Sequence, residues 1–251
     1  MDFSLQKGKE IVQISPSQFS IFKFFLAFLL ALLFLYLLLK LSKGKGVIFK
    51  VLFVFVVFFG GEIFFETFMP TIIAVPFVLI LILFWFRTCP IWFHNLLLGI
   101  GIAGIGAVVG FSLSPLIVVS LLLLFSVYDF ISVYKVKIAQ KIAKSMADSG
   151  AVLGIIIPKR PSDFKTQIKE VKIGSEEHNF FVLGSGDIIF PLLLSSSVFP
   201  HGAIKSGLIV CFSLIGLLVS FFLFLKLGKK PMPALPSIAL FSLIGYLIIC
   251  Y

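Results

Sequence analysis

From Thr88 to Tyr128 the chain has 41 consecutive residues without a charged side chain. One helix of that length would measure about 60 Å, roughly twice the hydrocarbon thickness of a bilayer. The segment FSLSP, Phe111 to Pro115, provides a break, so this run predicts two membrane-crossing helices. Of all 251 residues, only 13% are charged and 60% are hydrophobic. Soluble domains have about 25% charged residues, so we expect an integral membrane protein.

Apolar runs bounded by charged or turn residues predict eight spans, and a bilayer requires that each be a helix to satisfy its own backbone groups. The predicted fold is therefore all-α, a polytopic transmembrane helix bundle. The spans are Phe19–Leu39, Val47–Phe65, Thr71–Phe86, Ile91–Phe111, Pro115–Tyr134, Phe180–Val198, Ala203–Leu225 and Pro233–Cys250. They divide the chain into amino-terminal helices (1–134), a basic loop (135–179) and carboxy-terminal helices (180–251).

The basic residues predict how the chain is oriented. An even number of spans places both termini on one side, and 17 of the 21 Lys and Arg residues then lie on the other. Cytoplasmic loops carry an excess of Lys and Arg, so we predict a cytoplasmic 135–179 loop and both termini outside. The same rule accounts for the net charge of +10, and we predict no nucleic-acid partner.

Glycines and metal-ligating residues give no sign of a cofactor. The segment GIGIAG, Gly99 to Gly104, matches a dinucleotide-binding pattern but lies in the middle of a span. The pairs Gly99/Ala103 and Gly106/Gly110 instead predict close helix packing. The three His and three Cys residues share no ligand spacing, so we predict neither a metal nor another cofactor.

Two of the 11 acidic residues, Asp129 and Asp187, lie well inside predicted spans. Glu62 and Glu66 fall at the outer end of the second span, where we expect a solvated position. Asp129 precedes Lys135 by about 9 Å of helix, and Asp187 follows Phe180 by about 10 Å. The two helices are joined by the basic loop and run antiparallel, so the aspartates are predicted to lie at the same depth.

A charge within the bilayer costs at least about 2.5 to 3.5 kcal/mol on insertion scales, so such residues usually line a functional cavity. Two carboxyl groups in contact cannot easily both ionise, and we expect them to share one proton. Aspartic proteases use this arrangement, with one group activating water and the other protonating the carbonyl. The alternative is that each aspartate bonds a nearby backbone group or hydroxyl, such as Ser126, Ser132 or Ser185.

Two further segments favour a site at this depth. Gly184 and Gly186 precede Asp187, and helix-interior glycine is unfavourable unless another backbone passes close by; helix packing alone is the alternative. The segment KKPMPALPSIAL, Lys229 to Leu240, contains three prolines, which predict an irregular start to the last span. An ordinary proline-marked helix start would give the same pattern.

VYD at Asp129, GSGD at Asp187 and PALP at the last span together resemble the presenilin and signal peptide peptidase family of GxGD intramembrane aspartyl proteases, in a compact form similar to archaeal-type presenilin homologues. The similarity covers roughly Ile91 to Tyr251. It implies that Asp129 and Asp187 are the catalytic pair and that Tyr128 supports them. It also implies substrate contacts, for which the candidates are Gly184, Ser185, Gly186, Pro233, Ala234 and Leu235.

The resemblance has two departures. Family members usually have nine spans, against eight predicted here, and the position of Ser185 is often leucine. Presenilins are expected to have the catalytic loop in the cytoplasm, which agrees with the charge distribution. By this resemblance, the partners are transmembrane-helix protein substrates with their amino termini outside, within a lipid bilayer.

The predicted activity is hydrolysis of a peptide bond within a transmembrane helix. The substrate must unwind, and strand-like pairing with the enzyme would satisfy its backbone groups. Candidate pairing segments are the region near Pro233 and the run AVLGIII, Ala151 to Ile157, for which a membrane-surface segment or packing within the loop is the alternative. Three other functions stay open: a proton-coupled transporter, although the two halves show no internal repeat, a prepilin-type peptidase, and a non-catalytic scaffold or chaperone.

Overall fold

The computed structural model describes residues 45–133, 145–171, 180–226 and 232–250. The predicted span Phe19–Leu39, much of the basic loop and Lys229 to Pro231 lie outside these ranges. Each of the other seven predicted spans contains one helix, which confirms the all-α bundle. These helices are α2 (Lys45–Glu66), α3 (Thr71–Arg87), α4 (Ile91–Ser112), α5 (Pro115–Ile131), α7 (Ser185–Val198), α8 (Ala203–Lys226) and α9 (Leu235–Cys250).

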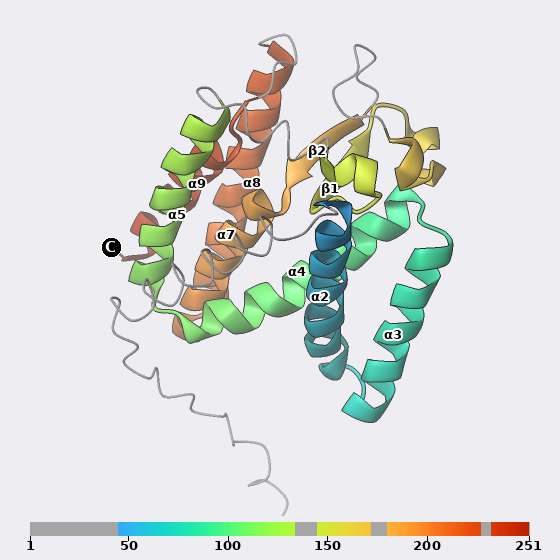
Figure 1. Cartoon of the computed structure of the whole chain (residues 1–251). Coiled ribbons are helices and arrows are strands. Elements are labelled where there is room, and N and C mark those ends of the chain that lie inside the picture. Colours follow the sequence, from blue (N-terminus) through green and yellow to red (C-terminus); the bar gives the residue numbers. More distant parts are fainter. Residues whose placement is uncertain (1–44, 134–144, 172–179, 227–231, 251) are drawn as a thin grey trace, which may run out of the picture.

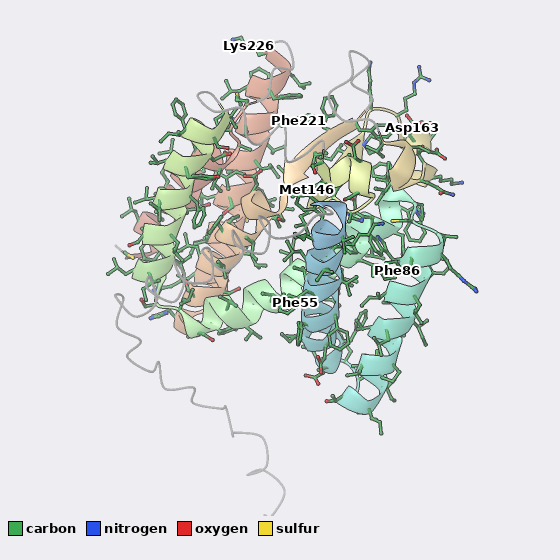
Figure 2. The ribbon with its side chains drawn as sticks, viewed as in Figure 1. Phe55, Phe86, Met146, Asp163, Phe221 and Lys226 are labelled. Atoms are coloured by element: carbon green, nitrogen blue, oxygen red, sulfur yellow. The ribbon has the colours of Figure 1, made fainter. Side chains whose placement is uncertain are left out.

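Judged by length and composition, three of the described helices could cross a bilayer: α2, α4 and α8. Helices α3, α5 and α9 are shorter apolar helices. Large apolar side chains such as Phe55, Phe86 and Phe221, labelled in Figure 2, are exposed, with exposed fractions of 55%, 57% and 44%. An apolar exterior of this kind suits an integral membrane protein.

Helix α4 crosses the molecule obliquely, between α2 and α3 on one side and α5, α7, α8 and α9 on the other (Figure 1). Helix α2 begins, and α3, α5 and α8 end, at the same end of the bundle, at the top of Figure 1. The small sheet lies toward this end. The chain therefore alternates in direction as predicted, while its orientation in a membrane stays a prediction.

The sixth predicted span is wrong over its first five residues. Phe180–Gly184 forms strand β2, which pairs antiparallel with β1 (Gly154–Pro158), with Ile156 opposite Val182. Both segments are rich in β-branched or aromatic residues, which suit strands. A short apolar run cannot be assigned to helix or strand by periodicity alone. Because α7 begins only at Ser185, Asp187 lies in its first turn.

The run Ala151 to Ile157 packs within the protein, as the alternative interpretation expected. Val152, Ile156 and Ile168 are fully buried and form a small core with Ile91, at the start of α4. The 3-10 turns η2 (Pro161–Lys165) and η3 (Ile168–Glu170) complete this loop. The sheet is therefore attached to the bundle through α4.

The glycines of α4 pack closely, but not in both predicted pairs. A Cβ at Gly104 would overlap the backbone carbonyl of Gly60 in α2, and one at Gly110 would lie 2.8 Å from the Leu193 carbonyl oxygen in α7. Gly106 also faces α7, so the Gly106/Gly110 prediction agrees with the structure. The Gly99 prediction is wrong, since nothing lies within 4 Å of a Cβ there; helix α2 contacts Gly101 and Gly104 instead.

Small and hydroxyl-bearing residues join the carboxy-terminal helices. The Oγ atoms of Ser213 in α8 and Ser242 in α9 lie 2.7 Å apart. Those of Ser195 in α7 and Ser206 in α8 lie 2.8 Å apart. Such hydroxyl pairs hold transmembrane helices together where hydrophobic association is weak. They hold α7 and α9 against α8.

Candidate active site

Helices α5 and α7 carry Asp129 and Asp187 on neighbouring turns. The rings of Phe125 and Phe190, one helical turn from each aspartate, stack with centroids 4.6 Å apart. Because the two helices run in opposite directions, this contact aligns the next turns, which carry the aspartates. The Asp129 carboxylate is near enough to interact electrostatically with Asp187. The two aspartates therefore lie on neighbouring turns of α5 and α7, while their common depth in a membrane stays a prediction.

Asp187 is oriented by the start of its own helix. Gly184 is the N-cap of α7, and its backbone hydrogen bonds with the Asp187 carboxylate. An acidic residue three positions after the N-cap often reaches back in this way. The N–H of Ser185 donates to the Leu153 carbonyl oxygen at 3.3 Å, which continues the pairing of β1 with β2. The end of the sheet thus determines where Asp187 lies.

Asp129 is held by the last span. The backbone N–H of Leu235 donates to Asp129 Oδ2 at 3.2 Å. The first N–H groups of a helix have no intrahelical partner, and a carboxylate is favourable there. This contact, rather than one with Ser126, Ser132 or Ser185, is the hydrogen bond that the described residues give to the Asp129 side chain.

The PALP segment explains why this N–H is available. Met232, Pro233 and Ala234 are not helical, and α9 begins at Leu235. Pro233 and Pro236 have no N–H, and of the two residues between them it is Leu235 whose N–H reaches Asp129. Its side chain is only 4% exposed and packs with Leu194 and other residues of α5, α7 and α8. The irregular start predicted for the last span is present at residues 232–234.

Gly184 and Gly186 do not serve to pack helices. A Cβ at Gly184 would meet only the Asp187 carboxyl group, with Oδ2 at 3.3 Å. One at Gly186 would meet only the Phe190 ring, at 3.6 Å. No other backbone among the described residues comes within 4 Å of these positions. Within the described chain, helix packing at these two glycines is therefore not observed, and the space beside Asp187 is open.

The remaining predicted site residues are more peripheral. Tyr128 is 57% exposed and contacts the Phe125 ring at 6.5 Å between centroids, so it supports the site only indirectly. Glu62 is partly buried, while Glu66 is exposed and accepts a hydrogen bond from Thr71 Oγ1 at 2.6 Å. Among the described residues, no three His, Cys, Asp or Glu side chains cluster as a metal site would require.

Sequence reasoning missed the residues that attach the sheet to α4. His94 is fully buried, with Nδ1 accepting from Trp85 Nε1 at 3.2 Å and Nε2 lying 2.7 Å from the Val152 carbonyl oxygen. Asn95 bonds both backbone groups of Ile156. The available signal was a His-Asn pair near the start of an otherwise apolar span.

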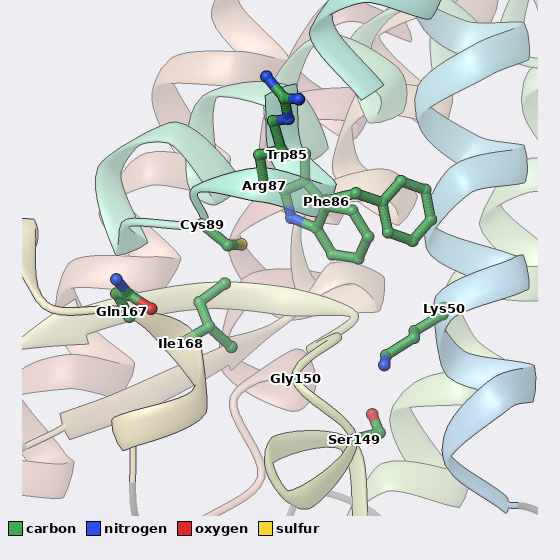
Figure 3. Close-up of a pocket in the computed structure, with 9 residues that line it drawn as sticks. All are labelled: Lys50, Trp85, Phe86, Arg87, Cys89, Ser149, Gly150, Gln167 and Ile168. Atoms are coloured by element: carbon green, nitrogen blue, oxygen red, sulfur yellow. The ribbon is translucent and has the colours of Figure 1, made fainter. Parts of the chain in front are cut away.

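A small cavity of about 80 Å³ lies beside this attachment, between α2, the end of α3 and the loop (Figure 3). Trp85 lines it together with Lys50, Arg87, Ser149, Gly150 and Gln167. Neither Asp129 nor Asp187 contributes to it, and none of its lining residues is acidic. The cavity is therefore distinct from the aspartate pair.

Comparison with known proteins identifies the family of this chain. Residues 5–251 match the family described as signal-peptide peptidase, presenilin aspartyl protease. No curated protein and no solved structure matched the chain. The match covers nearly the whole chain, including both aspartates and the PALP segment. The chain therefore belongs to the signal-peptide peptidase and presenilin family of intramembrane aspartyl proteases.

Proposed function

We propose that this protein is an intramembrane aspartyl endopeptidase whose catalytic pair is Asp129 and Asp187. The observation that carries the proposal is that α5 and α7 place Asp129 and Asp187 within electrostatic reach of each other, on turns next to the stacked Phe125 and Phe190 rings. The family match favours this function over the transporter and the prepilin-type peptidase. Each aspartate is oriented by a backbone N–H, from Leu235 and Gly184 respectively.

The chemistry follows from one proton shared between two carboxyl groups. The ionised aspartate takes a proton from water, whose oxygen attacks the carbonyl carbon of the scissile bond. The protonated aspartate gives its proton to the carbonyl oxygen, which forms a tetrahedral diol. Proton transfer to the amide nitrogen then breaks the C–N bond and releases a carboxyl group and an amine, and the pair regains its single proton.

Substrate binding requires an extended segment, and β2 offers an edge for it. In an antiparallel pair, successive residues direct their backbone groups alternately toward the partner strand and away from it. Ile156 directs its groups away from β2, to Asn95, so its partner Val182 faces away from β1. Within the described chain, no hydrogen bond reaches the N–H or C=O of Val182. A substrate strand added there would lie next to Asp187.

The decisive experiment replaces each aspartate in the reconstituted protein. We expect Asp129→Asn and Asp187→Asn each to abolish cleavage of a transmembrane substrate. Each variant keeps one carboxyl group, which cannot take a proton from water and give one to the carbonyl oxygen in the same step. Asp163→Asn, on η2, is the matched control and should keep wild-type activity. Product formation is followed by mass spectrometry, and folding by thermal unfolding in detergent.

Two outcomes would reject the proposal. One is full cleavage by a folded variant that lacks either carboxyl group. The other is substrate that stays intact with the wild-type protein while proteoliposomes take up a solute in response to a pH gradient, which would favour the transporter. Labelling by a transition-state analogue of aspartyl proteases, lost in both Asn variants, would place the two residues in one site.

A further inference from the structure

The first two turns of α4 hold the loop that carries β1. The N–H of Ile91 donates to the Thr166 carbonyl oxygen at 3.1 Å, and the Cys89 carbonyl oxygen accepts from the N–H of Ile168 at 3.0 Å. One turn further on, His94 and Asn95 reach Val152 and Ile156, before and within β1. The sheet is thereby attached to the bundle on the side opposite its open edge.

Asn95 acts toward β1 as a neighbouring strand would. Its Nδ2 donates to the Ile156 carbonyl oxygen at 2.7 Å, and its Oδ1 accepts from the N–H of Ile156 at 2.9 Å. A carboxamide can satisfy both groups at once because it has a donor and an acceptor side by side. Ile156 is fully buried, so leaving these groups without partners would be unfavourable.

His94 makes the neighbouring attachment rigid. Its ring stacks on Phe53 of α2 with centroids 4.5 Å apart, and Trp85 of α3 donates to its Nδ1. With Nδ1 accepting, Nε2 carries the hydrogen and donates to the Val152 carbonyl oxygen. Both ring nitrogens are therefore occupied. Three helices thus fix the segment that leads into β1, and Asn95 adds the contact that meets the strand itself.

We propose that Asn95 is a positioning residue of this protease: it occupies the outer edge of β1 and holds the hairpin in one place, so that an extended substrate pairs with β2 in a single register beside Asp187. The proposal rests on the proposed function. Side chains alternate along a strand with a period of two, so a substrate displaced on β2 keeps its pairing only when it moves by two residues. Because Asn95 holds the hairpin in one place, it favours one of these registers and thereby governs which bond is cut.

The test measures where one reconstituted transmembrane substrate is cut, by mass spectrometry of its products. For Asn95→Leu, which removes both hydrogen bonds, we expect the ratio of cleavage at the principal bond to cleavage two residues away to fall by about tenfold. Leu96→Ala is the matched control, since Leu96 is the next residue and is 50% exposed. It should leave the ratio unchanged.

A second variant keeps the test valid if Asn95→Leu does not fold. A protonated carboxyl group presents a donor and an acceptor like the carboxamide, whereas an ionised one has acceptors only. Asn95→Asp should therefore cut at the wild-type position at low pH and lose this preference at high pH. The wild-type ratio, measured at the same pH values, controls for the titration of other groups.

The outcomes separate this inference from the proposed function. If the wild-type protein cuts no substrate, the proposed function fails. If it cuts at one principal bond and both Asn95 variants cut more slowly at that same bond, with an unchanged ratio at every pH, then Asn95 is only structural and the inference is overturned. An altered ratio with full thermal stability supports it.

Discussion

Gly104 of α4 and Gly186 of α7 have opposite surroundings. At Gly104 an added Cβ would overlap the backbone of Gly60, whereas at Gly186 the nearest atom is an aromatic carbon at 3.6 Å. The first glycine closes a helix crossing, and the second leaves space beside Asp187. The same residue type thus builds a sealed region around α4 and an open one at the aspartate pair. The following variants test this difference.

The largest expected effect is on the sealed region. In Gly104→Ala the methyl group meets backbone, which cannot rotate away, so we expect destabilisation by about 3 kcal/mol, at the upper end for overpacking. For a chain of this size, thermal unfolding in detergent should then shift downward by about 6 to 12 °C. Gly99→Ala, on the same helix but in open space, should not be destabilised. Equal stability of the two variants would show that Gly104 does not close the crossing of α4 with α2.

The next effect concerns the hydrogen bond that orients Asp129. Leu235→Pro and Leu235→Ala both reduce the packing of a buried side chain, but only the proline variant loses the backbone N–H. A hydrogen bond to a charged group contributes about 1.5 to 3 kcal/mol. We therefore expect kcat about 10 to 100 times lower for the proline variant than for the alanine variant. Similar kcat values would show that this bond does not matter for catalysis.

A smaller effect is expected at the open region. Gly186→Ala introduces only an ordinary van der Waals contact and replaces a glycine in the first turn of α7, so stability should be unchanged or rise by up to about 1 kcal/mol. Activity should fall by about fivefold, because the methyl group occupies space proposed for substrate. The measurement pairs thermal unfolding with cleavage rate. Unchanged cleavage would mean that the substrate does not pass there.

The smallest effect is expected where hydroxyl groups rather than glycines close a helix contact. Ser213→Ala removes the contact with Ser242, and such interhelical bonds contribute about 0.6 kcal/mol on average in membranes. Thermal unfolding should shift by only about 1 to 2 °C. Ser120→Ala is the control, because this exposed serine bonds only the Leu116 carbonyl oxygen of its own helix. A much larger shift at Ser213 would mean that α8 and α9 depend on this pair.

Much of the bundle was predictable, because a bilayer allows few structures for an apolar run. The predicted spans from Val47 onward match helices to within a few residues, except at Phe180. There the prediction failed because FFVLG suits a strand and a helix equally, and only pairing with Gly154–Pro158 decides between them. The aspartates were predictable because charge inside a span is unfavourable and therefore rare.

The sequence by itself determined that this is an integral membrane protein, where its apolar helices lie from Val47 onward, and that Asp129 and Asp187 are acidic residues within otherwise apolar segments. These results follow from the cost of placing charge and unpaired backbone in hydrocarbon. Only the tertiary structure decided which glycines are sealed, that Leu235 donates to Asp129, and that Asn95 occupies the edge of β1. Such contacts join residues as far as 106 positions apart, and no local pattern encodes which distant backbone will supply the partner.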